Sequence, residues 1–154
     1  MFKVTIGIPV YNDSKNILTC LESIKNQTVG FENIEVICVD DGSTDDTARL
    51  IKKFTKKNQI NHNIVYLHQK NTGTPGEARN RIIDSARGEY IYFVDGDDYL
   101  GEDAVKKMYT IGIENNSDVI LGKFVGVNRK VPVVLFKETQ PKTDLFNSII
   151  IDSF

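Results

Sequence analysis

The sequence has few of the residues on which disulfide frameworks and zinc sites depend. Its 154 residues include two cysteines, Cys20 and Cys38, two histidines and no tryptophan. Both cysteines lie in segments of periodic apolar residues, where a free thiol packs as a small hydrophobic side chain. Two cysteines are too few for a disulfide framework or a cysteine-based zinc site. We therefore expect a cytoplasmic protein in a reducing environment, with the inner face of the membrane as an alternative location.

Excess positive charge and long hydrophobic runs are also lacking. Nineteen Lys and Arg stand against 21 Asp and Glu, and the formal net charge of -2 provides no overall field that would hold nucleic acid. No run approaches the roughly 20 apolar residues of a membrane-spanning helix, and the first residues do not resemble a secretion signal. With 40% apolar and 26% charged residues, the composition is typical of one globular domain. We expect no nucleic-acid partner.

The sequence does contain an alternation of short apolar runs with segments of helical period. We predict strands at residues 4–10, 34–39, 64–67, 90–94, 119–121 and 131–136, and helices through residues 17–24, 48–54, 78–86 and 102–114. This order is typical of an α/β fold in which a mostly parallel central sheet carries helices on both faces. Ligands of such sheets bind beyond the carboxyl ends of the strands. The polar residues that follow three of these strands therefore predict one shared site.

Three carboxylates follow the strand predicted at residues 90–94, in the segment Asp95-Gly96-Asp97-Asp98. Repulsion between them makes the cluster costly unless a cation is bound, and carboxylate oxygens favour Mg²⁺ or Mn²⁺, which take their other ligands from water and substrate phosphates. No His or Cys lies nearby in the sequence, so zinc is disfavoured. The alternative is an acidic loop that caps the helix beginning near Glu102. A second acidic pair at another strand end favours the metal site.

That second pair, Asp40-Asp41, follows the strand predicted at residues 34–39 and leads into a Gly-Ser-Thr turn. One interpretation is structural: Ser43 caps the next helix, while Asp45 and Asp46 lie at its positive end. That interpretation does not require both Asp40 and Asp41. Because a carboxylate here can accept the N3–H of a uracil ring, the pair is also a candidate for base recognition.

Several segments, in order and at consistent spacing, resemble the nucleotide-sugar domain of family 2 glycosyltransferases, which have the GT-A (Rossmann-like) fold. These segments are residues 4–12 (VTIGIPVYN), 39–45 (VDDGSTD), 78–80 (ARN), 88–90 (GEY) and 95–98 (DGDD). The resemblance covers about residues 3–122. Within the family, residues 71–80, 114–120 and 131–139 look like the wall teichoic acid enzymes that decorate polyribitol phosphate with N-acetylglucosamine.

The resemblance implies a uracil pocket at the first two strand ends. Pro9 and Tyr11 would line this pocket, with Tyr11 stacked on the base, while Asp41 and Asn71 would read the edge of the base. Taken alone, a Tyr at a strand end is as well explained as a half-buried aromatic side chain.

The resemblance also implies a diphosphate and metal region at the fourth strand. Arg79 would lie near the nucleotide, Asp97 would bind the Mn²⁺ or Mg²⁺ that bridges the diphosphate of a UDP-sugar, and Asp95 would contact the ribose or water bound to that metal. We count Asp95 and Asp97 together as the metal residues. A surface ion pair is the alternative for Arg79, and turn formation alone accounts for Gly73 and Gly76.

The chemistry implied by the resemblance is an inverting displacement at the anomeric carbon of the sugar. A carboxylate base deprotonates the acceptor, a glycopolymer or saccharide, and the metal offsets charge on the departing UDP. The family's base is usually an Asp well downstream, and no matching segment precedes Phe154; Asp144 and Asp152 are weak candidates. We expect residues 1–154 to form a single donor-binding domain, the N-terminal part of a longer protein truncated at its C-terminus, with the base beyond Phe154.

Three other interpretations were weighed. Without its base, the chain is a UDP-sugar-binding module that does not turn over. A dinucleotide-dependent oxidoreductase requires G-x-G-x-x-G after the first strand, where Pro9-Val10-Tyr11-Asn12 stands instead. A nucleotidyltransferase requires a basic loop at that place, which is likewise missing.

A basic run interrupts the segment predicted as the second helix. Its lysines predict a solvated helix face, with contact to a membrane or a polyphosphate as the alternative; they are Lys52, Lys53, Lys56 and Lys57. Peripheral membrane association of the full-length protein is therefore an alternative hypothesis. The oligomeric state stays open.

Overall fold

The computed structural model of the chain describes residues 1–125, 130–137 and 149–151, and it describes side chains for residues 1–122. The strands are β1 (Val4–Val10), β2 (Ile34–Asp40), β3 (Ile64–His68), β4 (Tyr90–Phe93), β5 (Val119–Val125), β6 (Lys130–Lys137) and β7 (Ile149–Ile151). The helices are α1 (Ile17–Lys25), α2 (Thr47–Asn58), α3 (Pro75–Ser85) and α4 (Ala104–Glu114), with a short 3₁₀ helix η1 (Phe31–Asn33). Each predicted strand and helix is present, with bounds that differ by a few residues. None of the helices in the described ranges is both long and apolar enough to cross a bilayer.

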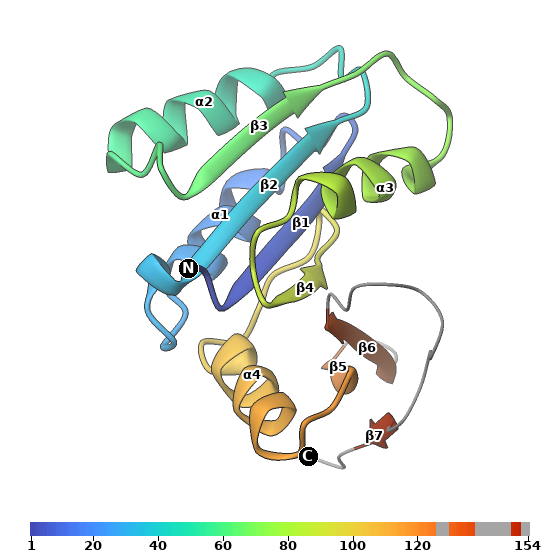
Figure 1. Cartoon of the computed structure of the whole chain (residues 1–154). Coiled ribbons are helices and arrows are strands. Elements are labelled where there is room, and N and C mark those ends of the chain that lie inside the picture. The colour runs from blue at the N-terminus through green and yellow to red at the C-terminus, as the bar shows by residue number, and fades with distance from the viewer. Residues whose placement is uncertain (126–129, 138–148, 152–154) are drawn as a thin grey trace.

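The strands form one sheet in the order β3-β2-β1-β4-β6-β5-β7 (Figure 1). β1 pairs in parallel with β2 and β4, and β2 pairs in parallel with β3. β6 lies between β4 and β5 and runs antiparallel to both. The predicted mostly parallel sheet is confirmed. The chain leaves β1 toward β2 and β3 on one side and later returns to β4 on the other, and ligands of open α/β sheets bind at such a switch point.

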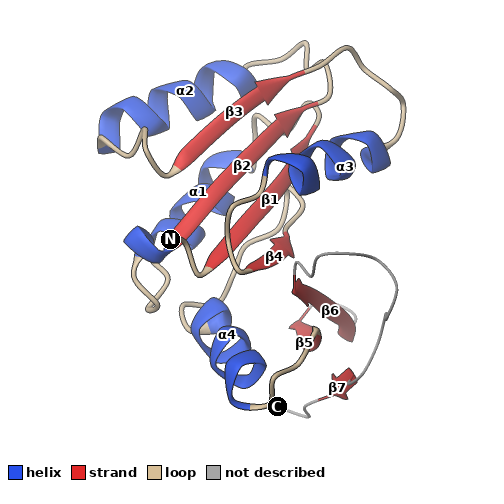
Figure 2. Cartoon of the chain, viewed as in Figure 1, coloured by secondary structure: helices blue, strands red, loops and turns tan. Residues whose placement is uncertain are grey.

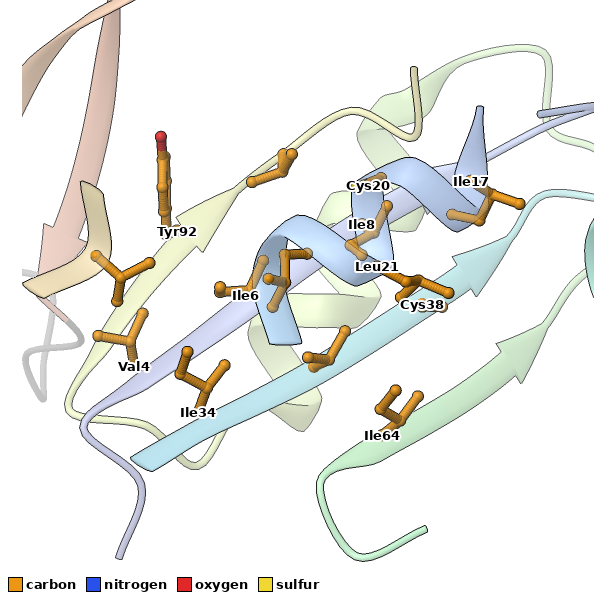
Figure 3. Packing of buried hydrophobic residues seen from close by; sticks show 14 of the residues in the cluster. Val4, Ile6, Ile8, Ile17, Cys20, Leu21, Ile34, Cys38, Ile64 and Tyr92 are labelled. Atoms are coloured by element: carbon orange, nitrogen blue, oxygen red, sulfur yellow. The ribbon is translucent and has the colours of Figure 1, made fainter. Parts of the chain in front are cut away.

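One face of the sheet packs on α1 and buries a continuous apolar core (Figure 3). Val4, Ile6 and Ile8 of β1 are fully buried there, together with Ile17 and Leu21 of α1. Side chains on a strand alternate between faces, and every second residue of β1 is β-branched, so one strand supplies a complete apolar row. This layer fixes the position of β1, which ends at the predicted site.

The opposite face packs on α3, so helices cover both faces of the sheet (Figure 2). α3 approaches β1 most closely at Gly7, where a Cβ would lie 2.5 Å from Cγ2 of Ile82. Only glycine allows this approach, because any side chain would push the helix away from the sheet. The first turn of α3 is thereby held beside the carboxyl end of β1.

A buried charge closes the amino ends of β1 and β2. Glu35 is 0% exposed, and Arg87 binds it through Nε at 2.6 Å and through its backbone N–H at 2.8 Å. Thr5 Oγ1 donates to Glu35 at 2.7 Å and accepts from the backbone N–H of Gly88 at 2.8 Å. We call these four residues the amino-end cluster. It ties the connection between α3 and β4 to the sheet.

One local expectation is corrected. Ser43 does not cap α2: its Oγ accepts the backbone N–H of Asn12 at 3.0 Å, and Asp45 accepts the backbone N–H of Thr47, the first residue of the helix, at 3.0 Å. The turn is longer than its sequence indicates, because the chain first passes beside the β1–α1 loop.

Candidate functional site

A cavity of about 390 Å³ opens at the carboxyl ends of β1, β2 and β4. Its lining includes every residue predicted for the site, namely Pro9, Tyr11, Asp41, Asn71, Arg79, Asp95 and Asp97. Gly73 also lines the cavity, whereas Gly76 is not among its lining residues. The strand-end rule therefore located the cavity correctly from sequence.

Tyr11 lines the cavity and is 51% exposed, so about half of its surface remains accessible. The next residue, Asn12, has a left-handed backbone with φ of 55°. Its Oδ1 accepts the backbone N–H of Thr44 at 2.8 Å and that of Asp45 at 3.4 Å. In return, Asp45 accepts the backbone N–H of Ser14 at 3.0 Å. We call this reciprocal arrangement the Asn12–Asp45 clasp; it joins the loops that follow β1 and β2 and thereby holds Tyr11.

Asp41 is 6% exposed, yet it lines the cavity. Gln69 Nε2 donates to its Oδ1 at 2.7 Å, and the backbone N–H of Thr72 donates to both oxygens at 3.1 Å. Burial raises the pKa of Asp41, but these hydrogen bonds outweigh burial and hold the pKa below its usual value. Asp41 is therefore an ionised acceptor fixed at one end of the cavity, suited to an N–H on the edge of a base.

Asp40, the neighbouring carboxylate, stabilises the fold by accepting hydrogen bonds. It is 1% exposed and accepts from Tyr66 Oη at 2.5 Å and from the backbone N–H of Ser43 at 2.7 Å. His68 Nδ1 lies 3.6 Å from the same carboxylate. The two adjacent acids thus differ in role: Asp40 braces the β2–α2 loop, and Asp41 faces the cavity.

The carboxylates after β4 lie at the other end of the cavity. Arg79 Nη2 contacts Asp95 Oδ1 at 2.8 Å, so the ion pair considered for Arg79 exists, and it lies inside the predicted site. The backbone N–H of Asp98 donates to the carbonyl of Asp95 at 3.0 Å, which closes the turn. Burial and the charges of Asp97 and Asp95 raise the pKa of Asp98. This end therefore carries more negative charge than the described protein groups compensate.

Asp13 is a lining residue that the sequence analysis missed. It accepts the backbone N–H of Tyr11 at 3.2 Å, and a Cβ on Gly96 would lie 2.7 Å from its Oδ2. Burial raises the pKa of Asp13, and the charges of Asp97, Asp45 and Asp95 raise it further. The position of Asp13, three residues after the end of β1, is a signal that could have indicated it. The segment that resembles the family ends at Asn12, so Asp13 was not predicted.

The donor atoms at this end fit a hard divalent cation. Within the described part of the chain, no three His, Cys, Asp or Glu side chains are arranged as a complete metal site. Mg²⁺ and Mn²⁺ are commonly held by one or two carboxylates together with substrate phosphates and water. Asp97 and Asp95 supply two carboxylates. The pKa of Asp13 is raised chiefly by burial and further by the charges of Asp97, Asp45 and Asp95, and a cation would relieve the part that comes from these charges. The residues present therefore fit a metal that arrives with a phosphorylated ligand.

The amino end of α3 forms a further wall of the cavity, through Thr74, Pro75, Ala78 and Arg79. Unpaired backbone N–H groups and the helix dipole make such an end favourable for anions. The cavity thus combines an aromatic rim, a buried acceptor, a helix amino end with one arginine, and a carboxylate end. A nucleoside diphosphate with a divalent cation has complementary chemistry at each of these points.

Comparison with known proteins agrees with this geometry. The family model described as glycosyl transferase family 2 matches residues 5–146. A poly(ribitol-phosphate) beta-glucosyltransferase of Bacillus spizizenii is 46% identical over 151 residues, which cover 97% of this chain and 23% of that protein. The poly(ribitol-phosphate) beta-N-acetylglucosaminyltransferase TarS of Staphylococcus aureus is 40% identical over 152 residues, covering 98% of this chain and 26% of TarS. The chain spans about a quarter of the length of these curated relatives.

A solved structure of a related protein has the same fold. The crystal structure of S. aureus TarS 1–349 in complex with UDP-GlcNAc has a TM-score of 0.78 and 37% sequence identity, and the match covers 85% of this chain and 37% of that one. The expected GT-A fold and the resemblance to teichoic acid glycosyltransferases are both confirmed.

Proposed function

The chain belongs to glycosyl transferase family 2, and from that premise we propose that it forms the donor-binding domain of an inverting, metal-dependent glycosyltransferase. The proposed donor is a UDP-sugar, and the proposed acceptor is a cell-wall glycopolymer such as polyribitol phosphate. The observation that carries the proposal is that all seven residues expected to contact the donor line one cavity. The similarity to two poly(ribitol-phosphate) glycosyltransferases supports the acceptor class.

The proposed donor spans the cavity from Asp41 to Asp97. The uracil ring stacks on Tyr11 above Pro9, and its N3–H donates to Asp41 with Asn71 beside it. The diphosphate lies toward the amino end of α3, where Arg79 supplies the positive charge. Asp97 and Asp95 would hold Mn²⁺ or Mg²⁺, which would act as a Lewis acid and offset charge on the departing diphosphate. Arg79 then has two tasks, since it contacts Asp95 and borders the phosphate region.

N-acetylglucosamine is the proposed sugar, because TarS was crystallised with UDP-GlcNAc and its matched region is 37% identical to this chain. Glucose is a second candidate, because the B. spizizenii relative is named a glucosyltransferase and is 46% identical. The two donors share the uridine diphosphate that the cavity is proposed to recognise, so the choice between them lies at the sugar end.

The general base is proposed to lie beyond Phe154, in the longer protein. Asp144 and Asp152 lie outside the described residues. Two of the carboxylates that line the cavity already have partners: Asp41 binds Thr72, and Asp95 binds Arg79. The alternative function is therefore UDP-sugar binding without turnover by these 154 residues. Both functions are proposed for the cytoplasm, which suits the two free, buried cysteines.

A calorimetric panel tests the proposal directly. The chain is titrated with UDP, CDP, ADP, UDP-N-acetylglucosamine and UDP-glucose, each with and without Mn²⁺. We expect uridine compounds to bind more tightly than the others and to depend on Mn²⁺. Transfer to polyribitol phosphate, followed by UDP release, is then compared between residues 1–154 and a longer chain. Equal, metal-independent binding of UDP, CDP and ADP would refute the donor assignment, and full transfer by residues 1–154 would refute the missing base.

A further inference from the structure

Helix α2 carries exposed lysines on the side opposite its buried residues. The helix buries Ile51 and Phe54, and no Asp or Glu occurs between Thr47 and Asn58. The outward side carries four exposed lysines one helical turn or less apart, which we call the lysine face: Lys52, Lys53, Lys56 and Lys57. The helix therefore concentrates positive charge in a chain whose net charge is -2.

Among the residues whose side chains are described, no carboxylate pairs with the lysine face. Arg49, one turn earlier, is already bound to Asp46 at 2.8 Å. Lys52 lies with its Nζ 4.7 Å from the centroid of the Tyr66 ring, a cation–π contact that attracts the ammonium group but supplies no negative charge. Like charges three and four residues apart on a helix destabilise it, so this arrangement carries a cost within the domain itself.

The helix dipole explains only part of the lysine face. Lys56 and Lys57 lie in the last turn of α2, where positive charge is favourable. Lys52 and Lys53 lie in the middle of the helix, beyond the reach of that effect. An external anionic partner accounts for all four lysines together.

The position of α2 decides between anionic partners. α2 packs on α1 and β3, and β3 is the strand at the edge of the sheet (Figure 1). The carboxylates Asp95 and Asp97 follow β4, which is separated from β3 by β2 and β1. An acceptor polymer must reach the proposed metal end, so the lysine face lies on the wrong side of the cavity to present it. A flat anionic surface does not need to reach the metal end of the cavity.

The mode of contact also follows from α2. None of the large exposed hydrophobic side chains in the described part of the chain belongs to this helix; they are Met1, Tyr11, Leu18, Ile83, Tyr99 and Ile113. Contact by α2 would therefore rest on charge and would not insert into the acyl region. Such contact is reversible and is weakened by salt.

We propose that the lysine face docks the domain on a membrane surface that contains anionic phospholipid. The choice of a membrane over the acceptor polymer rests on the proposed function, which places transfer at the metal end. A lysine near an anionic membrane surface strengthens binding roughly fivefold. Docking through α2 leaves the aromatic rim and the metal end of the cavity open to donor and acceptor.

Vesicle sedimentation tests the docking without UDP or metal, so its result is independent of the donor assignment. The chain is mixed with phosphatidylcholine vesicles with or without about 30% phosphatidylglycerol, and the bound fraction is measured on gels because tryptophan is absent. We expect binding only to the anionic vesicles, and its loss in 0.5 M NaCl, where the Debye length falls to about 4 Å. The variant Lys53→Gln/Lys57→Gln should bind roughly 25-fold more weakly.

The matched control is Lys106→Gln/Lys107→Gln, which removes the same charge from exposed positions on α4. This control should bind the vesicles as tightly as the wild type, and thermal melts should show both variants folded. Absence of binding to anionic vesicles by the wild type would overturn the proposal, as would an equal loss in the two variants. Binding to soluble polyphosphate but not to vesicles would overturn it in favour of a polymer.

Discussion

The two ends of the central sheet both carry buried or half-buried charge, but they treat it in opposite ways. At the amino ends, Glu35 is 0% exposed and every partner it needs comes from the fold: Arg87, Thr5 and a backbone N–H. At the carboxyl ends, Asp13, Asp95 and Asp97 line the cavity with a single arginine, Arg79, and Asp98 lies close enough to Asp97 and Asp95 to be affected by their charges. Burial, and after it the charges of neighbouring aspartates, raises the pKa of Asp13 and of Asp98.

The difference separates charge that serves folding from charge that is proposed to serve binding. A buried ion whose hydrogen bonds are complete needs nothing further from outside. A group of carboxylates that raise one another's pKa values stores unfavourable energy, which a cation or a hydrogen-bonding ligand releases on binding. The comparison predicts that substitutions at the amino end lower stability, whereas substitutions at the carboxyl end lower ligand affinity.

The largest effect is expected from Glu35→Ala. This change leaves Thr5 and the backbone N–H of Arg87 without their acceptor in a region closed to water. The free energy of unfolding should fall by roughly 3 kcal/mol, measured by urea denaturation. Glu114→Ala, at an exposed position on α4, is the control and should change stability little. The comparison fails if Glu35→Ala unfolds at the wild-type urea concentration.

Asp97→Asn should have the next largest effect, on binding and not on stability. Removing one carboxylate from the proposed metal site should weaken Mn²⁺-dependent UDP binding roughly 10- to 100-fold. The apoprotein should be as stable as the wild type or more so, because one repulsive charge is gone. Calorimetry with and without Mn²⁺ measures both effects. Asp84→Asn, on the exposed side of α3, is the control, and unchanged metal-dependent binding in Asp97→Asn would contradict the assignment.

The adjacent pair Asp40 and Asp41 allows the same contrast within two residues. Asp41→Asn should reduce the preference for UDP over CDP about 10-fold, because the amide can donate to a cytosine ring as well as accept from uracil. Asp40→Asn should lower the free energy of unfolding and leave the preference nearly intact, because Asp40 binds Tyr66 and Ser43. Nucleotide competition and urea denaturation are measured on both variants. If both variants lost the preference for UDP over CDP equally, Asp40 and Asp41 would not have different roles.

The sequence predicted the fold well where the evidence was local. Residues 4–10 form β1 as predicted, because β-branched residues dominate a short run. The residues predicted for the site line one cavity, because they follow strand ends, which the apolar runs mark. The insertion of β6 between β4 and β5 was not predicted, because strand order depends on pairing between distant segments. The partners of Asp41 were missed for the same reason: Gln69 and Thr72 are 28 and 31 residues away in sequence.

A smaller effect is expected from the Asn12–Asp45 clasp, which holds Tyr11 without contacting the proposed ligand. Asn12→Gly keeps the left-handed backbone but removes Oδ1, so the N–H groups of Thr44 and Asp45 lose their acceptor. UDP affinity should fall about fivefold, which is the equilibrium effect of one net hydrogen bond. Calorimetry measures it, with Asn61→Gly in an exposed loop as the control. Wild-type affinity in Asn12→Gly would show that Tyr11 is positioned by β1 alone.

The smallest effect is a change of stability with pH, and it has opposite signs for two aspartates at the carboxyl ends. Burial raises the pKa of Asp40, but hydrogen bonds from Tyr66 and Ser43 outweigh it, so the net pKa is below the usual value. Asp40 therefore stabilises the fold fully above about pH 4, the pKa of an unfolded Asp, and this stabilisation is lost as the pH falls further. Asp13 has a raised pKa, chiefly because of burial. Its ionisation costs stability as the pH rises above about 4 through that raised pKa.

Urea midpoints between pH 2.5 and 6 measure both contributions of this pair. Asp40→Asn should flatten the loss of stability below pH 4, because no carboxylate with a lowered pKa remains at that position. Asp13→Asn should leave that loss in place and raise stability near pH 6, because it removes a half-buried charge that Asp97 and Asp95 also repel. The two ends of the sheet differ in whether their carboxylates have complete hydrogen bonds or repel one another. If the two variants had the same pH profile, that difference would not hold between single residues at the carboxyl end.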